Sequence, residues 1–220
     1  MTVTAHHEKN LLDIQGKILL CSMMPFPTIA WWAKALKARK ICFDAFEHYQ
    51  KMSGRNRYYL AGPSGKQLLS IPLKGGRNQR VAMNKVRVDN DSGWRKTHWR
   101  TIQSFYGRAP FFEFFAEDLG DLFESSSESE NLYDWSLQGI RLVAGMMGMK
   151  LDIEHTEIYR EEYPCGEFSD IRILGGENKD VQDQRPYHQV FQDRAGFVAG
   201  CSVLDLMFCL GPQALNYLKR

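Results

Sequence analysis

Residues 48–60 concentrate the side chains that could do chemistry. The stretch HYQKMSGRNRYYL holds one histidine, three cations and two amides between flanking aromatic residues. Arginine presents fork-shaped donors that suit phosphate or carboxylate, an amide can donate and accept, and histidine is the side chain most easily tuned for proton transfer near neutral pH. The stretch therefore indicates a site for a phosphorylated or carboxylated ligand.

Two groups of residues are candidates for this site. The first lies within the stretch itself, and the second follows along the chain as Lys74 and a W-x-K-x-HW segment. A competing interpretation places Arg55 and Arg57 in a solvated loop, paired with carboxylates of the acidic half of the chain, residues 109–220. For His98, which shares a helix face with Trp94 and Ile102, the competing role is that of a satisfied core histidine. The candidates are His48, Gln50, Lys51, Arg55, Asn56, Arg57, Lys74, Lys96, His98 and Tyr106.

Other kinds of site lack their signatures. The sequence has no GxGxxG, GxxxxGK[ST], GxSxG or HExxH motif, and its histidines show no close spacing to other metal ligands, so we expect no metal site. The five cysteines are odd in number, scattered and without a CxxC pair, which indicates buried thiols instead of a disulfide framework.

Charge is divided unevenly along the chain. Residues 1–108 hold 19 Lys/Arg against 6 Asp/Glu, and residues 109–220 hold 9 against 20, although the net charge is only +2. The two halves could simply neutralise each other, or the basic half could hold phosphates. Residues 66–108, with ten Lys/Arg against two Asp, keep nucleic acid open as a partner, but no recognised nucleic-acid motif accompanies them.

Patterning predicts an α/β fold in one compact domain, residues 16–220, after a flexible tail at 1–15. A strand at 17–23, a helix after Pro27 and a strand at 40–46 would give a β-α-β opening. We expect a β-hairpin over 57–73, a half-buried strand at 84–90, helices from 94, 110 and 132, a strand at 151–159, a long loop, and two short helices divided at 211–212 in a helical C-terminal half.

The expected location of the protein follows from two features that the sequence lacks, a membrane span and a signal peptide. The best apolar run, residues 18–32, is interrupted by Pro25 and Pro27, so no membrane span is expected. The polar start of the chain does not resemble a signal peptide, and we expect a cytoplasmic protein.

Several motifs in order make the chain resemble the WbqC-like protein family. They are HYQK, RNRYYLAGPSGKQLLSIPL, the segment with Trp94 and Trp99, SFYGRAPFFEFF, YHQVF and SVLDLMFCLGP, and they extend from about residue 17 to 218. The family is bacterial and takes its name from a surface-polysaccharide (O-antigen) gene cluster. The resemblance implies a transferase of lipopolysaccharide biosynthesis that adds an acyl or aminoacyl group to a nucleotide-activated amino sugar.

On that expectation, the cationic and amide candidates hold the phosphates of a nucleotide sugar. His48 or His98 acts as general base, because acyl transfer needs an unprotonated nucleophile. The cofactor and acyl donor are left open. The alternative is a non-catalytic binding protein whose basic half docks on nucleic acid or an anionic carrier and whose acidic half docks on a partner enzyme.

Overall fold

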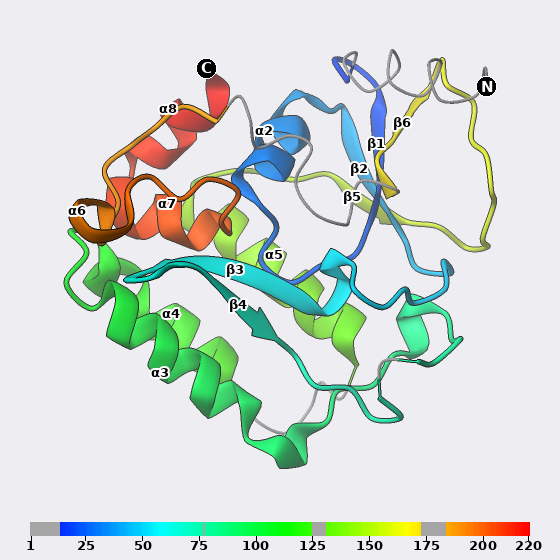
Figure 1. Ribbon diagram of the computed structural model, residues 1–220. Helices are drawn as coiled ribbons and strands as arrows, with labels where there is room; N and C mark the ends of the chain where they lie inside the picture. Colours follow the sequence, from blue (N-terminus) through cyan, green and yellow to red (C-terminus); the bar gives the residue numbers. More distant parts are fainter. Residues whose placement is uncertain (1–13, 77, 125–130, 173–183) are drawn as a thin grey trace.

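The computed structural model describes residues 14–76, 78–124, 131–172 and 184–220 (Figure 1). Its backbone forms a four-stranded parallel sheet, a separate β-hairpin, and helices that pack around both. The predicted α/β class, with a hairpin region and a helical C-terminal half, is confirmed.

The parallel sheet has the strand order β5-β2-β1-β6. Its members are β1 (Ile18–Ser22), β2 (Lys40–Asp44), β5 (Ile153–His155) and β6 (Phe168–Asp170). β1 is buried along its whole length, as expected for a strand covered on both faces. Helix α2 (Ile29–Lys37) connects β1 to β2, and its N-cap Thr28 accepts a hydrogen bond from the backbone N–H of Trp31. The predicted β-α-β opening is confirmed.

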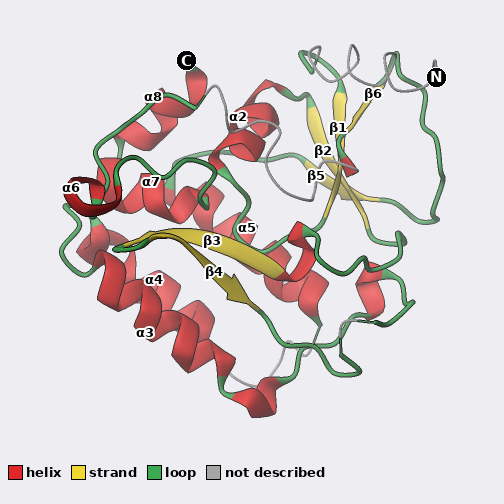
Figure 2. Ribbon diagram, viewed as in Figure 1, coloured by secondary structure: helices red, strands yellow, loops and turns green. Residues whose placement is uncertain are grey.

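The two faces of this sheet are covered differently. Leu19 and Phe43 point into the main core beneath the helices, whereas Leu20 and Cys42 pack with Tyr163 on the opposite face. Figure 2 shows α2 on one side of the sheet and loop segments on the other. The loop that follows β5 therefore performs the covering that a second helix layer performs in larger α/β folds.

The hairpin consists of β3 (Arg57–Gly62) and β4 (Gly65–Ser70), which pair antiparallel. Gly65 closes the tight turn with a positive φ of 101°, a conformation that favours glycine. Helix α3 (Trp94–Tyr106) packs so tightly against this turn that a Cβ atom on Gly62 would lie 2.7 Å from the Phe105 ring. The predicted hairpin is confirmed, with its second strand ending three residues earlier than expected.

The remaining helices also follow the expected pattern. They are α4 (Phe112–Glu124), α5 (Leu132–Met146), α6 (Gln192–Ala195), α7 (Val203–Leu210) and α8 (Gln213–Lys219). α7 and α8 are separated at Gly211, whose positive φ of 51° ends the first helix, and at Pro212. The short α6 was not predicted.

Three predictions need correction. Residues 84–90 form no strand, because one 3-10 helix (Met83–Lys85) occupies the start of the segment and another (Asn90–Ser92) begins at its end. The buried Val86 and Val88 lie between them, where the backbone makes only isolated bridges. The strand predicted at 151–159 is confined to β5, and β6 was missed within the long loop. Of the predicted tail, residues 1–13 lie outside the described residues, whereas Ile14 is buried in the core. Residues 125–130, in the acidic serine-rich sequence ESSSESEN between α4 and α5, also lie outside the described residues.

An aromatic cluster joins the sheet, the hairpin and the helices. The ring of Phe26, in the loop after β1, lies 5.1 Å from that of Tyr58 and 5.5 Å from that of Trp135. Trp94 continues the cluster at 5.0 Å from Trp135. Ring pairs at these separations stabilise a core beyond the area they bury, so the loop after β1 is held in place by packing.

All five cysteines are free, and four of them are buried. Cys165 alone is exposed, in the loop between β5 and β6. None of the helices in the described ranges combines the length and the apolar character needed to cross a membrane.

Candidate functional site

The carboxyl ends of the parallel strands bring polar side chains together. β1 ends in Ser22, β2 in Asp44 and β6 in Asp170, and Thr156 directly follows β5. Ligands of open α/β sheets bind outside this edge, because the loops there can carry polar groups without interrupting the strands. In Figure 1 the carboxyl ends of β1 and β2 point toward the hairpin, which borders this edge.

Asp44 and Arg172 form the first buried ion pair at this edge. Asp44 Oδ2 accepts from Arg172 Nη1 at 2.7 Å, and Asp44 Oδ1 accepts from Thr156 Oγ1 at 2.9 Å. Burial works to lower the pKa of Arg172, but its hydrogen bonds to Asp170 and Asp44 outweigh burial and raise it. Arg172 Nη2 donates to Asp170 Oδ2 at 2.6 Å and to the Glu161 carbonyl at 2.9 Å, which fixes the guanidinium.

Glu47 and Arg55 form the second pair. Arg55 donates from Nε to Glu47 Oε1 at 3.0 Å and from Nη2 to Glu47 Oε2 at 2.5 Å, a bidentate arrangement, and also from Nη2 to Ser22 Oγ at 3.0 Å. Burial raises the pKa of Glu47, and the hydrogen bonds from Arg55 oppose that rise. The side chains of Arg55 and Glu47 are 3% and 4% exposed, so the pair lies inside the fold beneath the surface of the edge.

An exposed loop lies above these pairs. His48, Gln50 and Lys51 are all exposed, and Lys51 Nζ makes a long 3.4 Å contact with Asn78 Oδ1. Met52, in the same loop, has a positive φ of 58°. The other non-glycine residue with positive φ in the described ranges is Phe26, in the loop after β1. Backbone strain of this kind concentrates at functional sites, and here it marks two loops of one edge.

His155 is a residue that the sequence analysis missed. It ends the edge strand β5, is exposed, and places Nδ1 2.6 Å from the hydroxyl of the buried Tyr133. Burial lowers the pKa of His155, which keeps the imidazole neutral near pH 7 and able to accept a proton. The signal that could have found it is its place at the carboxyl end of an alternating strand.

The chain matches the model of the WbqC-like protein family over residues 24–174. The protein belongs to the WbqC-like family. The matched region contains both ion pairs and His155, while Ser22 precedes it. The chain is also similar to the uncharacterized protein Rv1507c of Mycobacterium tuberculosis, with 23% identity over 208 residues that cover 81% of this chain and 87% of the relative. No solved structure matches it.

Within this family member, two residues of the RNR motif have different surroundings from Arg55. Asn56 is buried, donates from Nδ2 to the Ile71 carbonyl at 2.8 Å, and accepts from Tyr49 Oη at 3.0 Å. Arg57 is half-buried at the start of β3, and its Nε is enclosed with no hydrogen-bond partner in the part of the chain that the structure describes. Asn56 thus ties the loop to the chain after β4, and Arg57 retains an unused donor.

Three other sequence candidates lie on other segments of the chain. Lys74 and Lys96 are exposed, in the segment after β4 and on α3. Tyr106 is buried, donates to Asp205 Oδ1 at 2.8 Å, and accepts from the backbone N–H of Ala61 at 3.1 Å. These bonds connect α3, α7 and β3, so Tyr106 has a structural role.

His98 lies inside the packing between α3 and the hairpin. Its Nδ1 is 3.0 Å from Tyr58 Oη, and its ring stands edge-on to Tyr58 and Trp94 at 5.5 and 5.0 Å. No hydrogen bond or ring contact among the described residues joins it to His48. Burial lowers the pKa of His98 to about 4.

This depressed pKa predicts a pH dependence of stability. The unfolded chain binds a proton at His98 near pH 6.5, whereas the folded protein does not until about pH 4, so acid favours unfolding. We expect the free energy of unfolding to fall by ~3 kcal/mol from this group between pH 6.5 and 4. Urea titrations of wild type and His98→Phe across that range measure the difference. Parallel pH profiles for the two proteins would contradict the assignment.

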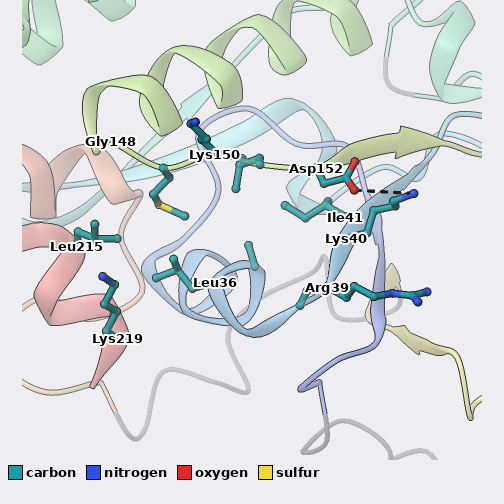
Figure 3. A pocket seen from close by; sticks show the side chains of 13 residues that line it. Leu36, Arg39, Lys40, Ile41, Gly148, Lys150, Asp152, Leu215 and Lys219 are labelled. Atoms are coloured by element: carbon teal, nitrogen blue, oxygen red, sulfur yellow. Dashed lines mark ion pairs between the residues drawn. The ribbon is translucent and has the colours of Figure 1, made fainter.

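A pocket of about 270 Å³ opens at the opposite, amino edge of the sheet (Figure 3). Leu36, Ile41 and Leu215 contribute apolar walls, while Lys40 turns toward Asp152, 3.9 Å away. The charged residues that line it are exposed or half-buried, and surface ion pairs contribute only ~0–1 kcal/mol. It lacks the enclosed polar groups of the carboxyl edge, which we therefore take as the functional site. Across the described ranges no group of three or more potential metal ligands occurs.

Proposed function

We propose that this protein is a cytoplasmic transferase that acts on a nucleotide-activated amino sugar in bacterial surface-polysaccharide biosynthesis. The observation that carries the proposal is the carboxyl edge of the parallel sheet, where two buried ion pairs underlie an exposed loop with His48, Gln50 and Lys51. Such an edge is where α/β proteins bind nucleotides. Family membership supports the sugar as the substrate class.

The phosphates would contact Lys51 and Gln50, whose side chains are exposed. A lysine supplies a mobile point charge for them. Arg55 was the sequence candidate for this contact, but its side chain is only 3% exposed and is held by Glu47 in a bidentate pair, so its role is to stabilise the loop.

The proposed reaction moves an acyl or aminoacyl group from an activated ester or thioester to the sugar amine. The amine nitrogen bonds to the acyl carbon, the bond from that carbon to the donor oxygen or sulfur breaks, and a base takes the amine proton. His98 is enclosed, so the exposed histidines that follow strands of the sheet are the accessible proton acceptors. They are His48 after β2 and His155 at the end of β5.

Ligand-dependent thermal stability tests this proposal. We expect a nucleotide-linked amino sugar at 100 times its dissociation constant to stabilise the protein by ~2.7 kcal/mol. Lys51→Ala combined with Gln50→Ala should reduce that shift, whereas Lys96→Ala, a cation on α3, should not. A screen in which no nucleotide sugar changes the melting temperature would overturn the proposal.

A second candidate function is the non-catalytic one, in which the basic half docks on nucleic acid or an anionic carrier and the acidic half meets a partner enzyme. Lys96 and Arg100, four residues apart on α3, are both exposed and present positive charge on one helix face. Salt dependence separates the two functions. Nucleic-acid binding would weaken steeply with added salt, because many counterions are released, whereas a small ligand would respond mildly.

A further inference from the structure

Two exposed rings face each other at the carboxyl edge. The imidazole of His48, after β2, and the phenol of Tyr159, after β5, have centroids 6.5 Å apart and planes 26° from parallel. Neither ring has another aromatic partner among the described residues. Tyr159 retains 52% of its surface, a large exposure for a tyrosine.

The two rings form a loose pair. Aromatic rings in direct contact have centroids about 4.5–7 Å apart, and the 6.5 Å between His48 and Tyr159 lies near the upper end of that range. Two rings that enclose a third lie about 7–8 Å apart, which is twice the optimal distance between carbon atoms. A small outward movement of the two exposed side chains would therefore open a slot that admits one planar ring.

Both walls of the slot are anchored. The guanidinium of Arg172 lies 5.6 Å from the Tyr159 ring and is itself held by Asp44 and Asp170. On the other side, His48 pairs with Ala82 in an isolated bridge. These contacts limit the conformations open to each side chain, so less conformational freedom is lost when a ligand binds.

The two loops carry exposed apolar side chains beside polar ones. Met52 and Ile158 are 67% and 56% exposed, in the loops after β2 and β5 that also carry His48 and Tyr159. Together with Tyr159 they are three of the five large apolar residues exposed in the described ranges. Gln50 and Lys51 add polar groups to the first of these loops. A ligand with flat apolar faces and polar edges suits such a combination.

We propose that His48 and Tyr159 clamp the nucleobase of the nucleotide-activated sugar. The inference rests on the proposed function, which supplies a ligand with one planar ring and adjacent phosphates. Gln50 and Lys51 lie two and three residues after His48, so a base between the rings would have cationic and amide side chains for its phosphates within the same loop. Every nucleobase presents an aromatic face, and stacking alone selects for a base without selecting which one.

The clamp gives His48 a role in substrate binding instead of proton transfer. A base stacked on the imidazole touches the flat face of the ring, whereas a proton would be accepted by a nitrogen lone pair in the ring plane. His48 therefore binds the substrate, and His155, held by Tyr133, is left as the proton acceptor. Replacement of His48 by another aromatic residue should then preserve function, which a catalytic base would not allow.

Isothermal titration calorimetry tests the clamp with ADP, GDP, UDP and dTDP, and with pyrophosphate as the probe that lacks a base. We expect at least one nucleoside diphosphate to bind at least about tenfold more tightly than pyrophosphate. His48→Ala and Tyr159→Ala should each remove most of that advantage while pyrophosphate binding stays unchanged. His48→Phe and Tyr159→Phe should retain it, and His188→Ala, at an exposed histidine elsewhere, serves as the matched control.

The outcomes separate the clamp from the proposed function. If nucleotide sugars bind but the alanine variants bind nucleoside diphosphates as wild type does, the clamp is wrong and the proposed function stands. The clamp also fails if His48→Phe binds as weakly as His48→Ala, since a ring nitrogen would then be needed. If neither nucleoside diphosphates nor nucleotide sugars bind the wild-type protein, both inferences fall.

Discussion

Replacing Arg55 by alanine is expected to lower the free energy of unfolding by ~3–5 kcal/mol, because the carboxylate of Glu47 would stay buried without its cation. Both side chains of the pair are less than 5% exposed, so water cannot take over the lost bonds. Urea unfolding followed by circular dichroism measures the change as a lower midpoint at an unchanged slope.

The matched control removes both charges together. The paired variant Glu47→Leu with Arg55→Met keeps the volume and leaves no buried charge, and it should be markedly more stable than Arg55→Ala alone. A loss below about 1 kcal/mol for Arg55→Ala would show that the pair is solvated. For binding studies, Lys51 and Gln50 are better targets than Arg55, since their exposed side chains can be changed without unfolding the site.

The second large effect is expected at Asp205, the buried carboxylate at the start of α7. It accepts hydrogen bonds from Tyr106, Tyr187 and Gln189, and burial raises its pKa. Asp205→Ala would leave three donors without an acceptor at a cost of ~1–3 kcal/mol each, and we expect a total loss of ~3–6 kcal/mol. Thermal or urea unfolding measures it.

Two other variants calibrate this result. Tyr187→Phe deletes one of the three bonds and should cost only ~1 kcal/mol. Asp193→Ala, at an exposed position in α6, should leave stability within ~0.5 kcal/mol of wild type. If Asp205→Ala were no more damaging than Tyr187→Phe, the carboxylate would not be the common acceptor that the geometry indicates.

The sequence predicted the elements whose patterns are local. The β-α-β opening, the hairpin and the amphipathic helices follow from apolar spacing and from turn residues such as Gly65, because each pattern is complete within one segment. β6 has three residues in a loop rich in glycine and proline, and only its pairing with β1 makes it a strand. Such pairing across about 150 residues has no local signature.

The candidate site was predicted in part for the same reason. The stretch at 48–60 does supply a loop of the carboxyl edge, but the selection of cations overlooked the carboxylates that hold them. Glu47 lies one residue before the chosen stretch, and Asp44 ends the preceding strand. The competing interpretation is right that Arg55 is ion-paired, but the pair is buried instead of solvated, and its partner Glu47 comes from the basic half of the chain.

The reactivity of the cysteines would report how often the fold opens. Burial raises the pKa of Cys21, Cys42, Cys201 and Cys209, and reagents attack the thiolate, so these four are protected twice while the fold is closed. Cys165 alone is open to solvent, in the same loop as Tyr159. A dye attached to Cys165 would lie in the loop that carries Tyr159. Slower modification of the four buried cysteines would measure how often the core opens to solvent.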